Sequence, residues 1–223
     1  MSKKTKQIYI FLAVVLVSVI FAGGAAGSRM KKWEKVVYAE NLDEVIATVD
    51  GTSLTLKDFG IYAVHEEKLV QEQALVYDDT DTKKYWNTHT NGGFLKITAR
   101  DAAIDLAIHD VIFYEMAQKN GISLNGEEEE YLANSQADFW SDLEEEQREK
   151  LAMSKEEVED ALLKMALAQK MQQQYALEKG KDDSEYDLTG DAYQEMLKEH
   201  EVTKNEEMID HIDFGNIILD HKK

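Results

Sequence analysis

Residues 45–59 have the sequence VIATVDGTSLTLKDF, and this stretch decides how the domain begins. Its first five residues are rich in β-branched side chains, and Asp50-Gly51 is a strong signal for a tight turn. Thr55 and Asp58 then have the spacing of a helix capping box. We therefore expect one short strand or hairpin, followed directly by a helix.

The rest of the chain is dominated by helical periodicity and helix-capping signals. We expect helices at about 56–77, 99–119, 125–147, 154–177 and 190–199, joined by loops of which 78–93 is the longest. The second of these helices is capped by Thr98 and is apolar on nearly every face, which is typical of the buried centre of a bundle. The expected fold class is mainly α, with a short N-terminal strand or hairpin and a hydrophobic helix ahead of it.

The C-terminal segment 202–219 is unusually apolar for the end of a chain. It contains Met208, Ile209, Ile212, Phe214, Ile217, Ile218 and Leu219. A cluster of this size is too apolar to stay exposed to water. We expect it to pack back onto the domain, which would then extend over residues 45–223.

The composition excludes several classes of site. The chain has 223 residues and is 43% hydrophobic, with no cysteine and no proline. Lack of cysteine excludes disulfides, thiolate zinc sites, cysteine nucleophiles and thioether-linked lipid anchors. Lack of proline suits a helical chain. The formal net charge of −19 disfavours binding to nucleic acids.

The first 27 residues have the pattern of an export segment. Three lysines precede an apolar run from Ile8 to Ala22, and small residues follow it, as in a secretory signal peptide. The stretch 8–27 is also long enough to cross a bilayer as a retained transmembrane anchor, which we favour slightly. Both alternatives place the domain outside the cytoplasm, and residues 28–44 would form a tether.

No catalytic or metal-binding motif stands out. The six histidines lack paired ligand spacing, and we expect His109 to be a hydrogen-bonded core residue. There is no nucleophile elbow and no phosphate-binding glycine loop in a suitable context. The acidic run 127–160 is interpreted as a solvated face. We expect no cofactor, no metal and no enzymatic activity.

Two stretches resemble a known family when taken in order. Residues 45–59 are similar to the opening strand, turn and helix of the helical chaperone domain in SurA- and PrsA-type foldases. Residues 117–128, AQKNGISLNGEE, resemble the junction between that domain's buried helix and the next one. The resemblance covers roughly residues 45–177 and extends to the C-terminal arms of trigger factor. It implies a helical chaperone fold.

The chain also departs from this family in two respects. Family members commonly carry a parvulin prolyl-isomerase domain after these helices, and only 46 residues follow Leu177 here. PrsA-type proteins are usually anchored through a lipidated cysteine, which is absent. A transmembrane helix within residues 8–27 would have to replace that anchor.

These considerations predict a membrane-anchored or secreted chaperone that acts outside the cytoplasm and lacks isomerase activity. Its partners would be unfolded or extended polypeptides, held in an apolar cleft between helices. Candidate cleft residues, chosen by residue type, are Phe59, Tyr62, Phe113, Met116, Phe139, Trp140, Met165 and Met171. The alternatives are a structural or adaptor subunit that uses the same fold to hold one partner, and a divergent prolyl isomerase.

Overall fold

The first two strands of the domain form a β-hairpin, as the sequence predicts. The computed structural model describes residues 35–90 and 93–219, and these lie in one compact unit that spans residues 31–223. Strands β1 (Val45–Val49) and β2 (Thr52–Thr55) pair antiparallel. The two residues between them, Asp50 and Gly51, both have positive φ angles, at 49° and 86°. This backbone conformation is the one that a two-residue hairpin turn requires.

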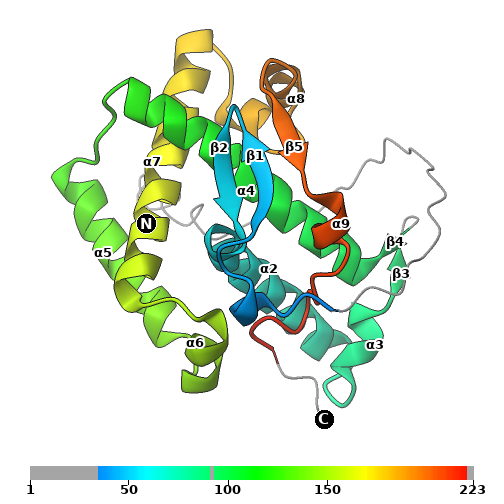
Figure 1. The fold of residues 1–223 in the computed structure, drawn as a ribbon. Coiled ribbons are helices and arrows are strands. Elements are labelled where there is room, and N and C mark those ends of the chain that lie inside the picture. Colours follow the sequence, from blue (N-terminus) through cyan, green and yellow to red (C-terminus); the bar gives the residue numbers. More distant parts are fainter. Residues whose placement is uncertain (1–34, 91–92, 220–223) are drawn as a thin grey trace. The chain divides into compact units, whose positions relative to one another are not determined.

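A third strand comes from the other end of the chain. Strand β5 (Val202–Lys204) pairs antiparallel with β1, so the order in the sheet is β2-β1-β5. Figure 1 shows β5 and the short helix α9 (Glu206–Ile209) beside the hairpin. The segment 202–219 therefore packs back onto the domain, with Ile209, Phe214 and Ile218 buried.

Three long helices form most of the core. They are α2 (Leu56–Tyr77), α4 (Leu95–Lys119) and α7 (Lys155–Lys179). Helix α4 packs against both α2 and α7 and is the central element that the sequence predicts. The fold is mainly helical with a small sheet, which confirms that part of the expected class.

Three of the predicted helix caps are present where the sequence places them, whereas Thr98, the cap expected for the second helix, lies inside α4. The Thr55 side chain accepts a hydrogen bond from the backbone N–H of Asp58 at the start of α2. Asn125 caps helix α5 (Gly126–Ser141), and Ser154 caps α7. Each cap satisfies backbone donors that a helix leaves free at its N-terminus.

The single helix predicted for 125–147 is wrong. Helix α5 ends at Ser141, and a separate helix α6 (Glu145–Leu151) follows. A further capping box between Glu144 and Gln147 starts α6, and the side chain of Leu143 is buried in the connection. Burial of this leucine and the extra cap stabilise the break better than a continuous helix would.

The prediction of a loop for residues 78–93 is also wrong. This segment forms a short helix and part of a small two-stranded sheet, whose bounds are α3 (Thr82–Trp86), β3 (His89–Thr90) and β4 (Gly93–Phe94). Trp86 is buried, and five residues are too few to show helical periodicity. Helix α4 starts at Leu95 rather than Ala99, without a side-chain cap.

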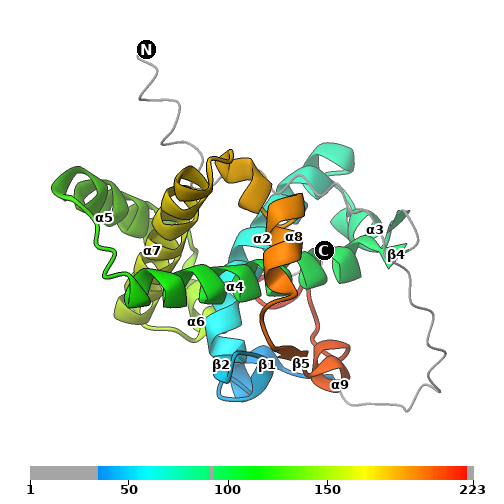
Figure 2. The same ribbon diagram turned by 90° about the horizontal axis from the view of Figure 1, so that it is seen from above.

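Two short elements complete the fold after α7. They are the 3₁₀ helix η3 (Asp183–Tyr186), which packs against α7, and helix α8 (Asp191–Leu197), which packs against η3. In Figures 1 and 2, α5 lies near the end of α4 that carries Lys119. Helix α3 and strands β3 and β4 lie at the end that carries Leu95. The two ends of α4 thus carry different surfaces.

The predicted tether, 28–44, is partly folded into the domain. Val36 forms a parallel bridge with Ile212, and the 3₁₀ helix η2 (Tyr38–Glu40) follows. Tyr38 is buried in the core. The apolar contacts of this tyrosine hold residues 35–41 against the domain.

The expected hydrophobic helix, and the choice between signal peptide and anchor, fall on residues 1–27. These residues lie outside the part of the chain that the structure describes. Within residues 35–90 and 93–219, no helix is both long and apolar enough to span a bilayer.

Candidate peptide-binding surfaces

Four of the eight residues predicted to line a cleft are core residues. Phe59, Tyr62, Phe113 and Met171 are at most 9% exposed. The Phe59 ring packs 6.3 Å from that of Phe214, and hydroxyl Oη of Tyr62 donates to Asp110. Burial raises the pKa of Tyr62 well above its usual value, so this phenol stays protonated. These side chains stabilise the packing of α2 and α4 and are closed to a ligand in this structure.

The other four predicted residues are partly buried and lie on three helices. Met116 is on α4, Phe139 and Trp140 are on α5, and Met165 is on α7. Helix α5 has no buried residue along its whole length and packs mainly against α7. None of the eight predicted residues lines either of the two hollows described below.

The first hollow lies between the last turns of α2 and helix α3. We call it the α2–α3 hollow; it has a volume of about 720 Å³ and is lined by Leu69, Glu72, Gln73, Val76, Tyr77 and Tyr85. Val76 is 89% exposed and Tyr77 is 67% exposed. Neighbouring large apolar side chains that are this exposed are typical of surfaces that bind other molecules. The hollow is therefore a candidate for binding apolar groups.

Helix α3 positions the far wall of this hollow. The Tyr85 ring packs 5.5 Å from that of Tyr77, and its hydroxyl donates to Oε1 of Gln73 at 2.9 Å. One residue along, the indole N–H of Trp86 donates to Oε1 of Gln71 at 2.8 Å. These contacts hold α3 against α2 and keep the two tyrosines at the rim. The sequence does not predict this site, because Tyr85 and Trp86 fall in a segment with the composition of a loop. The available signal is the pair of adjacent aromatic residues in that polar segment.

The charges around the α2–α3 hollow are mostly acidic. Glu72 lines it, and Asp78, Asp79 and Asp81 follow directly in the chain. Lys84 offsets two of these charges, with Nζ at 3.6 Å from Asp78 and 3.4 Å from Asp81. Hydrogen bonds from Thr80 lower the pKa of the Asp78 carboxyl. The surface thus combines apolar walls with a negative rim, a combination suited to segments that carry both apolar and basic residues.

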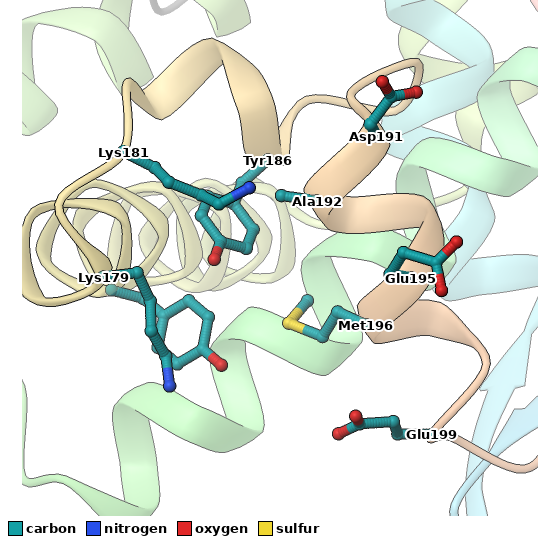
Figure 3. Close-up of a pocket in the computed structure, with 9 residues that line it drawn as sticks. Lys179, Lys181, Tyr186, Asp191, Ala192, Glu195, Met196 and Glu199 are labelled. Atoms are coloured by element: carbon teal, nitrogen blue, oxygen red, sulfur yellow. The ribbon is translucent and has the colours of Figure 1, made fainter.

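The second hollow lies where α7, η3 and α8 meet, and Figure 3 shows it from the open side. Its volume is about 370 Å³. Lys179 and Lys181 lie on one side, and the carboxylates of α8 lie on the other, with Met196 between them. Tyr175 and Tyr186 pack edge to face at 5.2 Å. Lys179 is engaged with the Tyr175 ring and Lys181 with Glu185, so both cations already have partners.

His109 is a hydrogen-bonded core residue, as predicted. It is 4% exposed, with Nδ1 at 2.9 Å from Oδ1 of Asp110 and Nε2 at 2.9 Å from the carbonyl oxygen of Tyr186. The Nε2 atom therefore joins α4 to η3, while Nδ1 contacts the next residue of α4. Among the described residues, no group of three or more histidine, aspartate and glutamate side chains is placed to hold a metal ion.

Helix α2 also carries two neighbouring buried carboxyl groups. Glu67 is fully buried and accepts backbone hydrogen bonds from Gly215, Ile217 and Ile218. Burial raises its pKa to about 7, although these three donors oppose the rise. Burial alone raises the pKa of Glu66 to about 7. The two side chains differ in that the carboxylate of Glu67 binds backbone N–H groups of the C-terminal segment.

Comparison with known proteins finds no relative of this chain. The chain matches no protein-family model, no curated protein and no solved structure. What the structure defines is a mainly helical domain with a three-stranded sheet and two surface hollows among its described residues. The resemblance to SurA- and PrsA-type foldases stays a prediction from the two sequence stretches.

Proposed function

We propose that this protein is a membrane-associated chaperone that acts outside the cytoplasm. It holds unfolded or extended segments of exported proteins and has no prolyl-isomerase activity. The observation that carries the proposal is the exposed apolar wall of the α2–α3 hollow, where Val76 and Tyr77 remain open to water. Apolar side chains displayed in this way are typical of surfaces that bind other polypeptides.

The chemistry of the hollow defines the kind of segment it would hold. Its volume of about 720 Å³ has room for a few apolar side chains, which would lie in an open depression rather than in an enclosed pocket. The rings of Tyr77 and Tyr85 offer flat apolar contact with polar edges. Glu72 and Asp79 favour basic residues next to the apolar ones. Such contacts depend little on sequence, which suits a protein with many clients.

The test uses the full-length chain in lipid nanodiscs, with empty nanodiscs as the blank. We expect the chain to suppress light scattering by a client protein that aggregates when its disulfides are reduced. We also expect it to bind a fluorescent, permanently unfolded polypeptide with micromolar affinity. The double variant Val76→Asp/Tyr77→Asp replaces two apolar side chains of the hollow by negative charges, and it should lose most of both activities. The control Leu177→Asp changes an equally exposed apolar residue on α7 and should keep them.

Two outcomes would overturn the proposal. The first is equal activity of the double variant and the Leu177→Asp control, because the hollow would then have no special role. The second is binding of a single folded partner at a fixed stoichiometry with no affinity for unfolded chains, which would indicate the adaptor alternative. Catalysis of prolyl isomerisation in a short peptide would contradict the statement that the protein lacks this activity.

A further inference from the structure

We propose that the groove holding residues 214–218 is a binding site for client segments, and that the chain's own C-terminal tail occupies it until a client displaces the tail. The inference deepens the proposed function and rests on it. The ligand class is a segment with one aromatic residue followed by glycine in a turn, and two adjacent aliphatic residues three and four positions after the aromatic one. We call residues 213–219 the tail and its site the tail groove.

The polar part of the tail groove is a single side chain that recognises backbone. Oε1 of Glu67 accepts the N–H groups of Gly215 at 2.6 Å and Ile217 at 2.9 Å, and Oε2 accepts that of Ile218 at 2.9 Å. Glu67 projects from the middle of α2 and is fully buried. Because all three donors are backbone amides, this contact is open to any segment that adopts the same path, which requires glycine at the position equivalent to Gly215.

The apolar part of the groove accepts three side chains. The ring of Phe214 packs 6.3 Å from Phe59 and 6.2 Å from Trp86. Ile217 and Ile218 are both buried. The aromatic pocket is built by α2 and α3, the same helices that form the α2–α3 hollow. The two sites are therefore neighbours in the chain: Tyr85 lines the hollow, and the next residue, Trp86, contacts Phe214 and donates its indole N–H to Gln71 on α2.

The tail is held as a bound peptide is held, through apolar side chains and captured amides. It contains no helix or strand over residues 213–219, and its exposed residue Asn216 points away from the core. Other polar contacts are peripheral: Lys35 pairs with Asp213, and Lys150 donates to the carbonyl oxygen of Leu219 at 3.3 Å. Displacement of this segment leaves the β1–β5 pairing of the sheet intact, since β5 ends at Lys204.

Gly215 makes it possible to loosen the tail without changing the groove. Its φ angle is +89°, and a Cβ at this position would lie 2.9 Å from Cε3 of Trp86. Gly215→Ala is therefore strained in the docked tail. A client with glycine at the equivalent position does not feel this strain. Because a tethered tail competes at a high effective concentration, loosening it should make the groove more available to peptides in solution.

The probe is a fluorescent peptide with the sequence of residues 212–219, IDFGNIIL, added to the full-length chain in nanodiscs. We expect Gly215→Ala to bind it at least 5-fold more tightly than the unmodified chain does. A peptide N-methylated at the nitrogens equivalent to Ile217 and Ile218 lacks two of the three donors and should bind at least 10-fold more weakly. Equal affinity of the two peptides, or no gain from Gly215→Ala, would overturn the proposal.

Glu66 supplies the matched control for Glu67. Glu66 is buried on the same helix and has no hydrogen-bond donor among the described residues. In the Gly215→Ala background, Glu67→Gln should weaken binding of the peptide at least 5-fold, whereas Glu66→Gln should leave it within 2-fold. Equal effects of the two substitutions would show that the carboxylate of Glu67 is not a peptide contact.

A second measurement needs no variant and separates this inference from the proposed function. Hydrogen exchange at the amides of Gly215, Ile217 and Ile218 is followed in the unmodified chain, with and without an unfolded client. Loss of protection on client binding supports displacement of the tail. If the client binds and is kept soluble while these amides stay protected, the inference fails and the proposed function stands. If the peptide displaces the tail and no client is bound, the proposed function fails.

Discussion

The hydroxyl of Tyr62 on α2 donates a 3.1 Å hydrogen bond to Oδ2 of Asp110 on α4. The other carboxylate oxygen of Asp110 lies 2.9 Å from Nδ1 of His109, and Nε2 of that ring meets the carbonyl oxygen of Tyr186. One chain of polar contacts therefore joins α2, α4 and η3 through the core. It assigns Tyr62, which the sequence suggested as a ligand contact, to the interior of the domain.

We predict that Tyr62→Phe lowers the free energy of unfolding by about 1–3 kcal/mol, because Asp110 would lose a donor in a site where its side chain is only 12% exposed. Denaturant unfolding of the full-length chain measures this loss. Tyr114→Phe, a matched change at a less buried tyrosine on α4, should cost less than about 0.5 kcal/mol. Similar losses at both positions would contradict the role assigned to the Tyr62–Asp110 bond.

Gly60→Ala tests whether residues 35–41 belong to the domain. A Cβ at Gly60 would overlap the hydroxyl of Tyr38 and lie 3.2 Å from Cδ1 of Leu151. We expect a loss of about 1–3 kcal/mol, as for other overpacked cores. Adding Tyr38→Phe removes the overlapping oxygen and should restore part of that loss. Gly126→Ala, which meets nothing within 4 Å, is the neutral control.

Tyr38 also provides a prediction of the opposite sign. Its hydroxyl is buried and has no hydrogen-bond partner among the described residues. Burying such a group without a partner costs free energy. Tyr38→Phe alone should therefore leave the thermal midpoint unchanged or raise it. A fall in the midpoint comparable to that of Tyr62→Phe would show that the hydroxyl is bonded in solution.

The sequence predicts helix starts well where a side chain forms the cap. Thr55, Asn125 and Ser154 each stand where a helix begins, because their oxygens must lie next to free backbone N–H groups. The start of α4 was placed four residues late because Phe94 precedes it without a side-chain cap. Local chemistry determines the first kind of boundary, and tertiary packing determines the second.

The candidate site was less predictable than the fold. Residue type suggested Phe59 and Phe113 for a cleft, and both are buried in the core. Aromatic and methionine side chains serve core and cleft equally well, so only the tertiary structure separates the two uses. Glu67 gave no signal at all, since one glutamate among 44 acidic residues reveals its burial only when the distant tail is folded against it.

Glu66 makes stability depend on pH in a defined direction. Its pKa is raised by burial from an ordinary value of 4.5 to about 7 in the folded chain. Between these values the unfolded state has released the proton and the folded state still holds it. The unfolded state thus binds fewer protons, and the free energy of unfolding falls as the pH rises through this window.

Glu66→Gln should remove the part of this dependence that Glu66 contributes, because the amide does not ionise, whereas Glu67, whose pKa burial also raises to about 7, keeps its own part. We expect the variant to be more stable than the unmodified chain at pH 8, by roughly 1–3 kcal/mol, and equally stable near pH 4. Denaturant unfolding at the two pH values measures the difference. Glu72→Gln, at an exposed position on the same helix, is the control and should show no such change. A gain for Glu66→Gln that is the same at both pH values would contradict the assignment to ionisation.

Arg148 should hold helix α6 against the end of α5. Its Nε and Nη2 atoms donate to the carbonyl oxygen of Trp140 at 3.1 and 2.8 Å, and its guanidinium lies 5.1 Å from the centre of the Trp140 ring. This carbonyl belongs to the last turn of α5, where no helical N–H is left to bond it. Arg148→Met should lower the free energy of unfolding by about 1–2 kcal/mol, as measured by denaturant unfolding.

Arg148→Lys should recover only part of this loss, because an ammonium cannot supply two donors in a fixed fork. The control Lys198→Met removes an exposed partner of Glu195 and should cost less than about 0.5 kcal/mol. Full recovery by lysine would show that charge, rather than the paired hydrogen bonds, stabilises this junction.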